Sequence, residues 1–198
     1  MDAQLIAAAA NGDVADIERL VADGADPDAR DDDGSPALMV ATRDGHADAV
    51  RALLAAGADV DAQDARQDNV FLYAGAEGLL DILRLATDAG ADPTITNRFG
   101  GTALIPASER GHVEVVRYLL NETDVDVDHV NRLGWTALLE AIVLSDGGPR
   151  HQEVVALLIE HGADVDLADG NGVRPLAHAR ARGFTEITAL LEAAGATP

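Results

Sequence analysis

The sequence predicts an all-α protein built from tandem helix-turn-helix units, and three observations support this prediction. A Gly-Ala-Asp turn recurs at residues 24–26, 57–59, 90–92 and 162–164, and its first three copies start 33 residues apart. Self-similarity at such a period is typical of repeat solenoids, in which each unit contacts mainly its neighbours. The segments between the turns carry apolar residues at helical spacing, for example Val50, Leu53 and Leu54. Glycine also recurs between the two apolar segments of a unit, as at Gly45 and Gly78.

Alignment on this turn divides the chain into six units. We expect one domain, 1–198, with units at approximately 1–30, 31–63, 64–96, 97–130, 131–168 and 169–198. Each inner unit begins with a short β-turn finger, continues with a first helix, a glycine turn and a second helix, and ends at the Gly-Ala-Asp turn. Small alanines such as Ala41 and Ala107 recur where the first helices must approach one another closely.

Capping residues mark the expected ends of the helices. A side-chain oxygen that precedes a helix can accept a hydrogen bond from its free N–H groups. A left-handed glycine after a helix can end it. The candidates for the first role are Asn69, Thr102 and Thr136, and those for the second are Gly24, Gly57, Gly90 and Gly162.

Four departures from the repeat predict local irregularities. Gln67 stands where other fingers have glycine, so we expect a distorted turn there. Residues 121–124 carry one extra residue and no glycine stop, and Pro106 should loosen the first turn of its helix. Residues 144–152 are about five longer than the equivalent turn elsewhere, and Gly147, Gly148 and Pro149 cannot continue a helix. We expect that segment to be an exposed loop.

The amino-acid composition argues against some classes of binding partner. The net charge is −21, with 35 acidic residues against 14 basic residues, all of them arginine. An acidic surface repels phosphate, which argues against nucleic acid and anionic membranes as partners. The absence of lysine indicates either a GC-rich genome or adaptation to high salt. The chain has no cysteine, which excludes disulfides and thiolate metal sites.

The ends and the hydropathy of the chain predict its location. The N-terminus lacks a basic region followed by a long apolar core, so we expect no signal peptide. No run approaches the roughly 18 apolar residues that a membrane-spanning helix needs. We expect a monomeric, cytoplasmic protein.

Several segments resemble the ankyrin repeat over essentially the whole chain. They include Gly-x-Thr-Ala-Leu at residues 100–104 and 134–138, Gly-His-Val-Glu-Val-Val-Arg-Tyr-Leu-Leu at 111–120, and Glu-His-Gly-Ala-Asp-Val-Asp at 160–166. Other stretches are similar to short, free-standing bacterial ankyrin proteins. The resemblance implies an ankyrin-repeat solenoid that binds a protein partner on a concave face made of finger tips and first helices.

On that face we expect arginines and large apolar side chains to carry binding, because hot spots favour Trp, Tyr and Arg. Arg66, Arg98 and Arg132 occupy three successive fingers, and the only tryptophan of the chain lies beside an apolar finger residue. We expect Glu140 to pair with Arg110 or with a cation of the ligand. The candidate partner-binding residues are Arg66, Tyr73, Arg98, Phe99, Arg110, Arg132, Leu133, Trp135, Glu140 and Leu144.

Other functions are less favoured. The alternative to a protein partner is a small-ligand sensor with a notch between the third, fourth and fifth units, near Tyr73, Arg110, Trp135 and Glu140. Glu140 and His178 could form an acid–base pair, but no nucleophile accompanies them, so we expect no enzyme activity. Aspartates 124, 126 and 128 lack the glycine and glutamate of a calcium loop. We expect neither a metal nor a cofactor.

Overall fold

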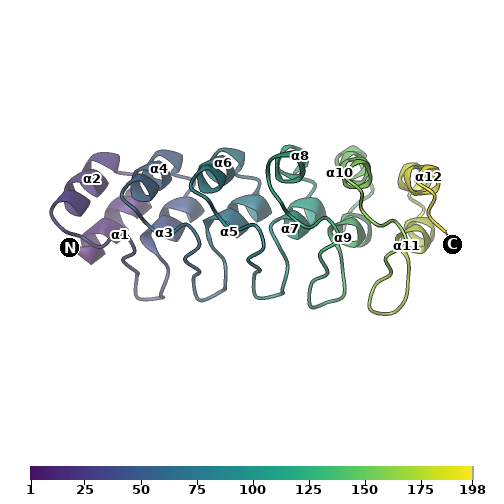
Figure 1. Cartoon of the computed structure of the whole chain (residues 1–198), viewed down its shortest axis with the longest axis horizontal. Coiled ribbons are helices and arrows are strands. Elements are labelled where there is room, and N and C mark those ends of the chain that lie inside the picture. The colour runs from purple at the N-terminus through teal and green to yellow at the C-terminus, as the bar shows by residue number, and fades with distance from the viewer. Residues whose placement is uncertain (198) are drawn as a thin grey trace. The chain divides into compact units, whose positions relative to one another are not determined.

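Six helical hairpins make up the computed structural model, which describes residues 1–197 (Figure 1). Pro198, the last residue of the sixth expected unit, lies outside the described residues. The helices are α1 (Asp2–Asn11), α2 (Val14–Ala22), α3 (Ala37–Arg43), α4 (Ala47–Ala55), α5 (Val70–Glu77), α6 (Leu80–Asp88), α7 (Leu104–Glu109), α8 (Val113–Glu122), α9 (Ala137–Val143), α10 (Pro149–Glu160), α11 (Pro175–Arg182) and α12 (Thr185–Ala193).

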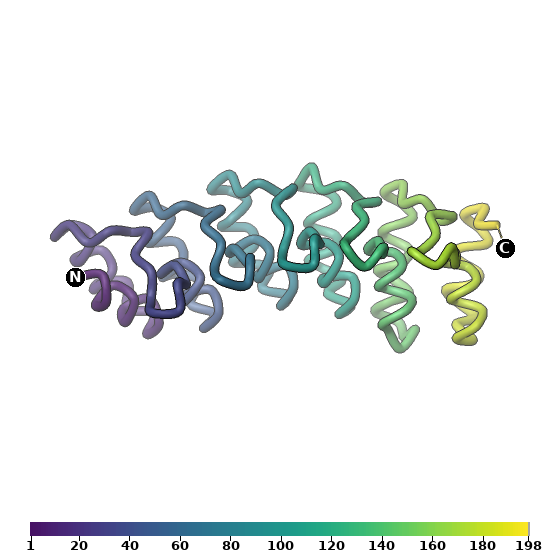
Figure 2. Tube along the Cα trace, turned by 90° about the horizontal axis from the view of Figure 1, so that it is seen from below, coloured from purple at the N-terminus to yellow at the C-terminus, as the bar shows by residue number. Residues whose placement is uncertain are grey.

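The residues group into two compact units. Unit 1 comprises Met1–Ala74 and Leu79–Arg98, and unit 2 comprises Gly75–Gly78 and the chain from Phe99 onward. Between successive hairpins the chain runs through a finger, our name for residues 31–35, 64–68, 97–101, 131–135 and 169–173. Each finger is a tight U-shaped turn (Figure 2). Within residues 1–197, the only β-pairing is an isolated bridge between Arg30 and Pro36.

Alanine at one position of each first helix makes close packing possible. The alanines of this column, fully buried, are Ala41, Ala74, Ala107, Ala141 and Ala179. The first helices α7 and α9 pack against each other in unit 2, and the first helices α1 and α3 do so in unit 1. A methyl side chain at these positions lets backbones approach, whereas leucines such as Leu53 and Leu119 on the second helices fill the space between hairpins.

Capping follows the sequence expectation with one exception. The Asn69 Oδ1 accepts from the Leu72 N–H at 2.9 Å, and the Thr136 Oγ1 accepts from the Leu139 N–H at 3.2 Å. The expected cap at Thr102 is wrong, because its buried Oγ1 has no partner within the described residues. The cause is Pro106: it has no N–H to donate to the Thr102 carbonyl, so the Ile105 N–H bonds that carbonyl at 3.3 Å instead.

The exposed loop expected at residues 144–152 is wrong in its second half. Pro149 begins α10 rather than blocking it, since proline suits the first position of a helix, where no N–H is needed. The insertion therefore lengthens α10 to 12 residues. His151 and Ser145 are buried, the Arg182 Nη2 donates to the Ser145 carbonyl at 2.7 Å, and Gly147 lies against the Phe184 ring.

The distorted turn expected at Gln67 is also wrong. Gln67 adopts φ 61°, close to the φ 78° of Gly34 in the preceding finger. The Gln67 N–H bonds the Asp64 carbonyl at 3.0 Å, as the Gly34 N–H bonds the Asp31 carbonyl at 2.9 Å. The turn is therefore conserved in shape, and a residue with a side chain bears the left-handed conformation at a cost of about 1 kcal/mol.

We predict opposite effects for two substitutions at this turn position. Gly34→Ala should lower the free energy of unfolding by about 1 kcal/mol, because a Cβ there meets no atom within 4 Å and only the positive φ opposes it. Gln67→Gly should leave stability unchanged or raise it by up to about 1 kcal/mol. Urea unfolding of both variants checks this, and equal losses in both would contradict it.

We predict a larger loss at Gly147, which tests the packing of the insertion. A Cβ there would lie 2.4 Å from the Phe184 Cδ1. Gly147→Ala should therefore cost about 2 kcal/mol or more in unfolding free energy, through overpacking added to the strain of φ 68°. The double variant with Phe184→Ala should recover the overpacking part. A Gly147→Ala variant no less stable than Gly34→Ala would show that the segment is a free loop.

Candidate functional site

An Asp or Asn side chain organises each finger whose turn bonds are described. Its Oδ1 accepts hydrogen bonds from the N–H groups two and four residues ahead, at distances from 2.7 to 3.1 Å. Such Asx turns hold a tight loop in one conformation without relying on its tip residues. The column consists of Asp31, Asp64, Asn131 and Asp169.

In three of these fingers, the second polar atom of the Asp or Asn side chain bonds a residue on a first helix. The carboxylates bond basic side chains, and the amide bonds a carboxylate. The Arg43 guanidinium bonds the Asp64 carboxylate, and the His178 Nε2 lies 2.8 Å from the Asp169 Oδ2. Where the finger residue is an amide, the Asn131 Nδ2 donates to the Glu140 Oε1 at 2.8 Å. Fingers 64–68, 131–135 and 169–173 are thereby bonded to a first helix.

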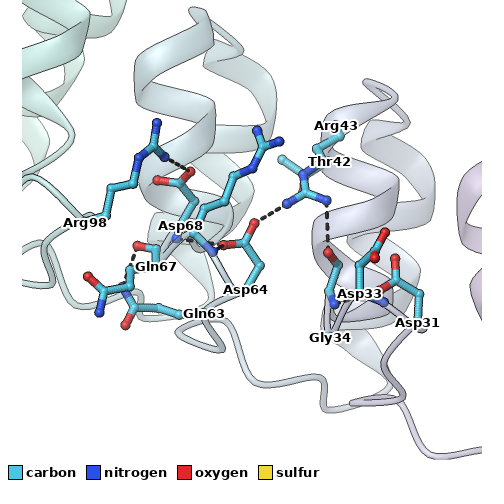
Figure 3. A network of polar contacts seen from close by, with 12 residues as sticks. Asp31, Asp33, Gly34, Thr42, Arg43, Gln63, Asp64, Gln67, Asp68 and Arg98 are labelled. Atoms are coloured by element: carbon cyan, nitrogen blue, oxygen red, sulfur yellow. Dashed lines mark hydrogen bonds and ion pairs between the residues drawn. The ribbon is translucent and has the colours of Figure 1, made fainter.

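A polar pocket of about 370 Å³ lies in unit 1 between fingers 31–35 and 64–68. Its lining consists of Asp33, Ser35, Arg43, Asp64, Ala65 and Arg66. Figure 3 shows Arg43 on α3 directed toward Asp64, with Asp31 and Asp33 on the neighbouring finger. The Arg43 Nη1 also donates to the Ser35 Oγ at 3.0 Å. Ser35 and Asp64 are buried, so this wall of the pocket is rigid.

Three predicted site residues belong to unit 1. Arg66 is exposed at the pocket, and Tyr73 is half-buried on α5. The Arg98 Nη1 lies 3.7 Å from the Asp68 Oδ2, so the fingers that carry Arg66 and Arg98 are linked by an ion pair (Figure 3). Burial and the neighbouring Asp64 raise the pKa of Asp68, and Arg98 opposes that rise.

In unit 2 the structure joins fingers 97–101 and 131–135. The Arg132 N–H donates to the Phe99 carbonyl at 2.9 Å, and the His129 Nε2 lies 2.7 Å from the Gly100 carbonyl. Gly100 packs closely on the aliphatic part of the Arg132 side chain, and a Cβ added to Gly100 would lie 2.8 Å from the Arg132 Cγ. The two tips therefore form one preorganised surface, which we call the paired tips, with Phe99, Arg132 and Leu133.

Large apolar side chains are exposed on and beside the paired tips. Phe99 is 49% exposed and Leu133 61%. Leu144 at the end of α9 is 48% exposed, whereas Trp135 is half-buried. Among the described residues, the exposed large apolar side chains other than Met1 all lie between residues 99 and 144. Exposed large apolar side chains that gather in one part of a folded protein are candidates for an interface.

The expected pairing of Glu140 with Arg110 is wrong. The Arg110 Nη1 donates to the Glu77 Oε1 at 2.6 Å and to the Ala76 carbonyl at 2.8 Å. Glu140 lies buried against Asn131 instead. Burial, helped by the charge of Glu109, raises the pKa of Glu140 to about 7, and the bond from Asn131 only partly opposes this.

Sequence reasoning missed the Asx column and the role of Arg43. The signal for the column was present, because Asp31 and Asp64 recur at the repeat distance ahead of each finger tip. The bond from Arg43 to Asp64 was not readable, since it joins α3 to the following finger, 21 residues away.

The described part of the chain has neither a cluster of metal-ligating side chains nor a candidate membrane-spanning helix. Among residues 1–197, no three His, Cys, Asp or Glu side chains are grouped so that they could hold a metal ion. None of the helices in that range is long and apolar enough to cross a membrane.

We predict that Glu140 destabilises the fold at alkaline pH. Its pKa is about 7 in the folded chain and about 4.5 unfolded, so folding takes up a proton between these values and stability falls as pH rises through that window. The penalty above pH 7 is on the order of 3 kcal/mol at most. Relative to the parent, Glu140→Gln should gain about 2 kcal/mol in urea unfolding at pH 8 compared with pH 5.

Glu109→Gln is the control for that experiment, because removing the second carboxylate should recover only part of the gain. If the Glu140→Gln difference does not change between pH 5 and pH 8, the carboxyl is ionised at its ordinary pKa and the burial argument fails.

Comparison with solved structures places this geometry among repeat proteins. An ankyrin repeat domain from Acinetobacter baumannii is 54% identical, covers 100% of both chains and superposes with a TM-score of 0.96. The ankyrin repeat domain of Bcl-3, a member of the IkappaB protein family, is 27% identical, covers 98% of this chain and 86% of its own, and gives a TM-score of 0.88. The predicted fold class, an all-α ankyrin-repeat solenoid, is confirmed.

Sequence comparison agrees. The ankyrin repeat protein YahD from Escherichia coli K12 is 56% identical over 99 residues, which are 50% of this chain and 49% of YahD. The aligned region thus spans about half the length of that relative. The family model for ankyrin repeats in three copies matches residues 5–97 and 71–169. The helical hairpins, the finger turns and these matches together show that the chain belongs to the ankyrin-repeat family.

Proposed function

We propose that this protein is a non-enzymatic interaction module that binds one protein partner through its finger tips and first helices. Ankyrin repeats generally mediate protein–protein interaction. The observation that supports a specific face is the exposure of Phe99 and Leu133 on the paired tips of unit 2. A monomeric state and a cytoplasmic location stay predictions.

The paired tips have the properties of a binding hot spot. Burying an exposed Leu or Phe side chain contributes roughly 1.5–3 kcal/mol. The hydrogen bond from Arg132 to the Phe99 carbonyl and the turn around Asn131 hold both tips before a partner arrives, so little conformational entropy is lost on binding. Trp135, half-buried beside Leu133, and Leu144 would extend the contact along α9.

Charge narrows the kind of partner. Arg66 and Arg98 of unit 1 and Arg132 of unit 2 occupy fingers in a chain of net charge −21. Guanidinium groups bind carboxylates in bidentate fashion. The overall negative field repels an acidic protein, so the partner is expected to be neutral or basic and to present a local segment with carboxylate and apolar side chains.

The small-ligand alternative has less support. Arg110 and Glu140, the charged groups expected to hold the ligand, already bond Glu77 and Asn131. A ligand would have to break these bonds before it gained its own.

The test is affinity capture from the native host with quantitative mass spectrometry. A partner should be captured by the parent but at least tenfold less by Phe99→Ala and Leu133→Ala, and Trp135→Ala should cost roughly 2 kcal/mol in affinity. Arg132→Ala should lose less, and mainly at low salt.

Arg84→Ala is the matched control for that set, because Arg84 lies exposed on the second helix α6 beside Asp81. It should bind like the parent. A partner that binds equally to all variants, each unfolding at the parental temperature, would move the site away from the paired tips.

A further inference from the structure

We propose that the pocket between fingers 31–35 and 64–68 receives an acidic side chain of the partner, whose carboxylate binds Arg66 while a neighbouring basic side chain faces Asp33. This inference rests on the proposed function and specifies a second contact, in unit 1, chemically distinct from the apolar paired tips.

The size and lining of the pocket fit a charged side chain. Its volume of about 370 Å³ lies within the range of small-ligand sites, roughly 300–1,000 Å³. Such sites are usually apolar, whereas five of the six residues that line this one are polar or charged, the exception being Ala65. A ligand must therefore offer hydrogen bonds and charge rather than hydrocarbon.

Two charged side chains of the lining have no direct bond to another described residue, although one of them, Arg66, acts electrostatically on Asp68. The charge of Arg43 is paired with that of Asp64, and its Nη1 donates to the Ser35 Oγ, so this part of the wall is neutral overall. The side chains of Arg66 and Asp33 make no hydrogen bond or ion pair within the described residues. The Arg66 guanidinium thus has donors for a carboxylate, and the Asp33 carboxylate has acceptors for a cation.

Both walls of the pocket are fixed by bonds between neighbouring repeats. The Arg30 Nη1 donates to the Gly34 carbonyl at 2.7 Å and to the Gln63 carbonyl at 2.9 Å. The Gln63 Nε2 donates to the Gln67 carbonyl at 2.7 Å (Figure 3). It also donates to the Thr96 carbonyl at 3.0 Å. These bonds link the backbones of the two fingers, so the backbone positions that carry Arg66 and Asp33 are held close together before binding.

Backbone strain lies next to this pocket in the chain, although the strained residue does not line it. Gln67, which follows Arg66, is the one non-glycine residue with positive φ within the described residues. Strained backbone that a turn could avoid by using glycine tends to occur at binding and catalytic sites.

The charges around the pocket favour a partner segment that carries both a negative and a positive group over a ligand that is only an anion. Asp33, Asp64 and Asp68 lie around Arg66, and the whole chain carries −21. A multiply charged phosphate would meet this field without compensation. A segment with a carboxylate and an adjacent ammonium group places each charge against its opposite.

The pocket can be tested with the full chain and a dipeptide probe. The probe is acetyl-Glu-Lys-amide, followed through the Arg Nε–Hε signals in NMR. The Arg66 signal should shift saturably, with a millimolar dissociation constant. Acetyl-Gln-Lys-amide, which lacks the carboxylate, should bind at least fivefold more weakly, and so should acetyl-Glu-norleucine-amide, which lacks the ammonium group.

Variants separate binding at the pocket from a general charge effect. Arg66→Gln should abolish the saturable response in the remaining finger amides, and Asp33→Asn should remove the preference for lysine over norleucine. Arg84→Gln, on α6, should respond like the parent. Equal responses to the Glu and Gln probes, or an unchanged response in Arg66→Gln, would overturn the proposal.

This experiment is independent of the partner capture described above. If the dipeptide probes cause no shift but partner capture still depends on Leu133, the pocket proposal is refuted and the proposed interaction module is not affected. A responsive pocket without any captured partner would refute the module and identify a site for free dipolar ligands.

Discussion

Hydrogen bonds whose two ends are one repeat apart set the register of each unit. The Arg30 guanidinium bonds the Gln63 carbonyl, and the Gln63 amide bonds the Thr96 carbonyl, in each case 33 residues ahead. The Asp59 N–H bonds the Asp28 Oδ1 in unit 1, and the Asp164 N–H bonds the Asp128 Oδ1 in unit 2. A side chain in such a column must match the backbone of the next repeat. This constraint explains why aspartate follows three of the four Gly-Ala-Asp turns, at Asp28, Asp61 and Asp166.

Side-chain hydrogen bonds also fix the base of each finger, whereas the tip residues take little part in them. The Asx side chains and their first-helix partners hold the base. Apart from the left-handed residue at the fourth position, which is Gly34, Gln67, Gly134 or Gly172, they require no particular residue at the tip. Tip chemistry can therefore differ along the chain, with Asp32 and Asp33 in one finger and Arg132 and Leu133 in another. Binding specificity can change in such a protein without loss of the fold, because tip side chains contribute little to the packing between hairpins.

The differences between expectation and structure have two kinds of cause. Some are local: Pro149 begins α10 because proline suits the first position of a helix, and the Gln67 N–H donates to the Asp64 carbonyl in the same left-handed turn that glycine forms in other fingers. Others lie in a neighbouring repeat. The pairing of Glu140 was misassigned because Arg110 already bonds Glu77 in the preceding repeat.

The sequence by itself determined the repeat period, the helical class, the glycine stops and the family, because these depend on local propensity and on columns that recur along the chain. It also indicated that Phe99, Leu133 and the finger arginines lie at the tips. Only the tertiary structure decided which charged side chains are bonded to other residues of the protein, and therefore which ones are left to bind a ligand. Arg43 and Arg66 are the same residue type, yet one is bonded to buried Asp64 and the other faces the pocket. That difference depends on distances between neighbouring repeats, which sequence spacing does not specify.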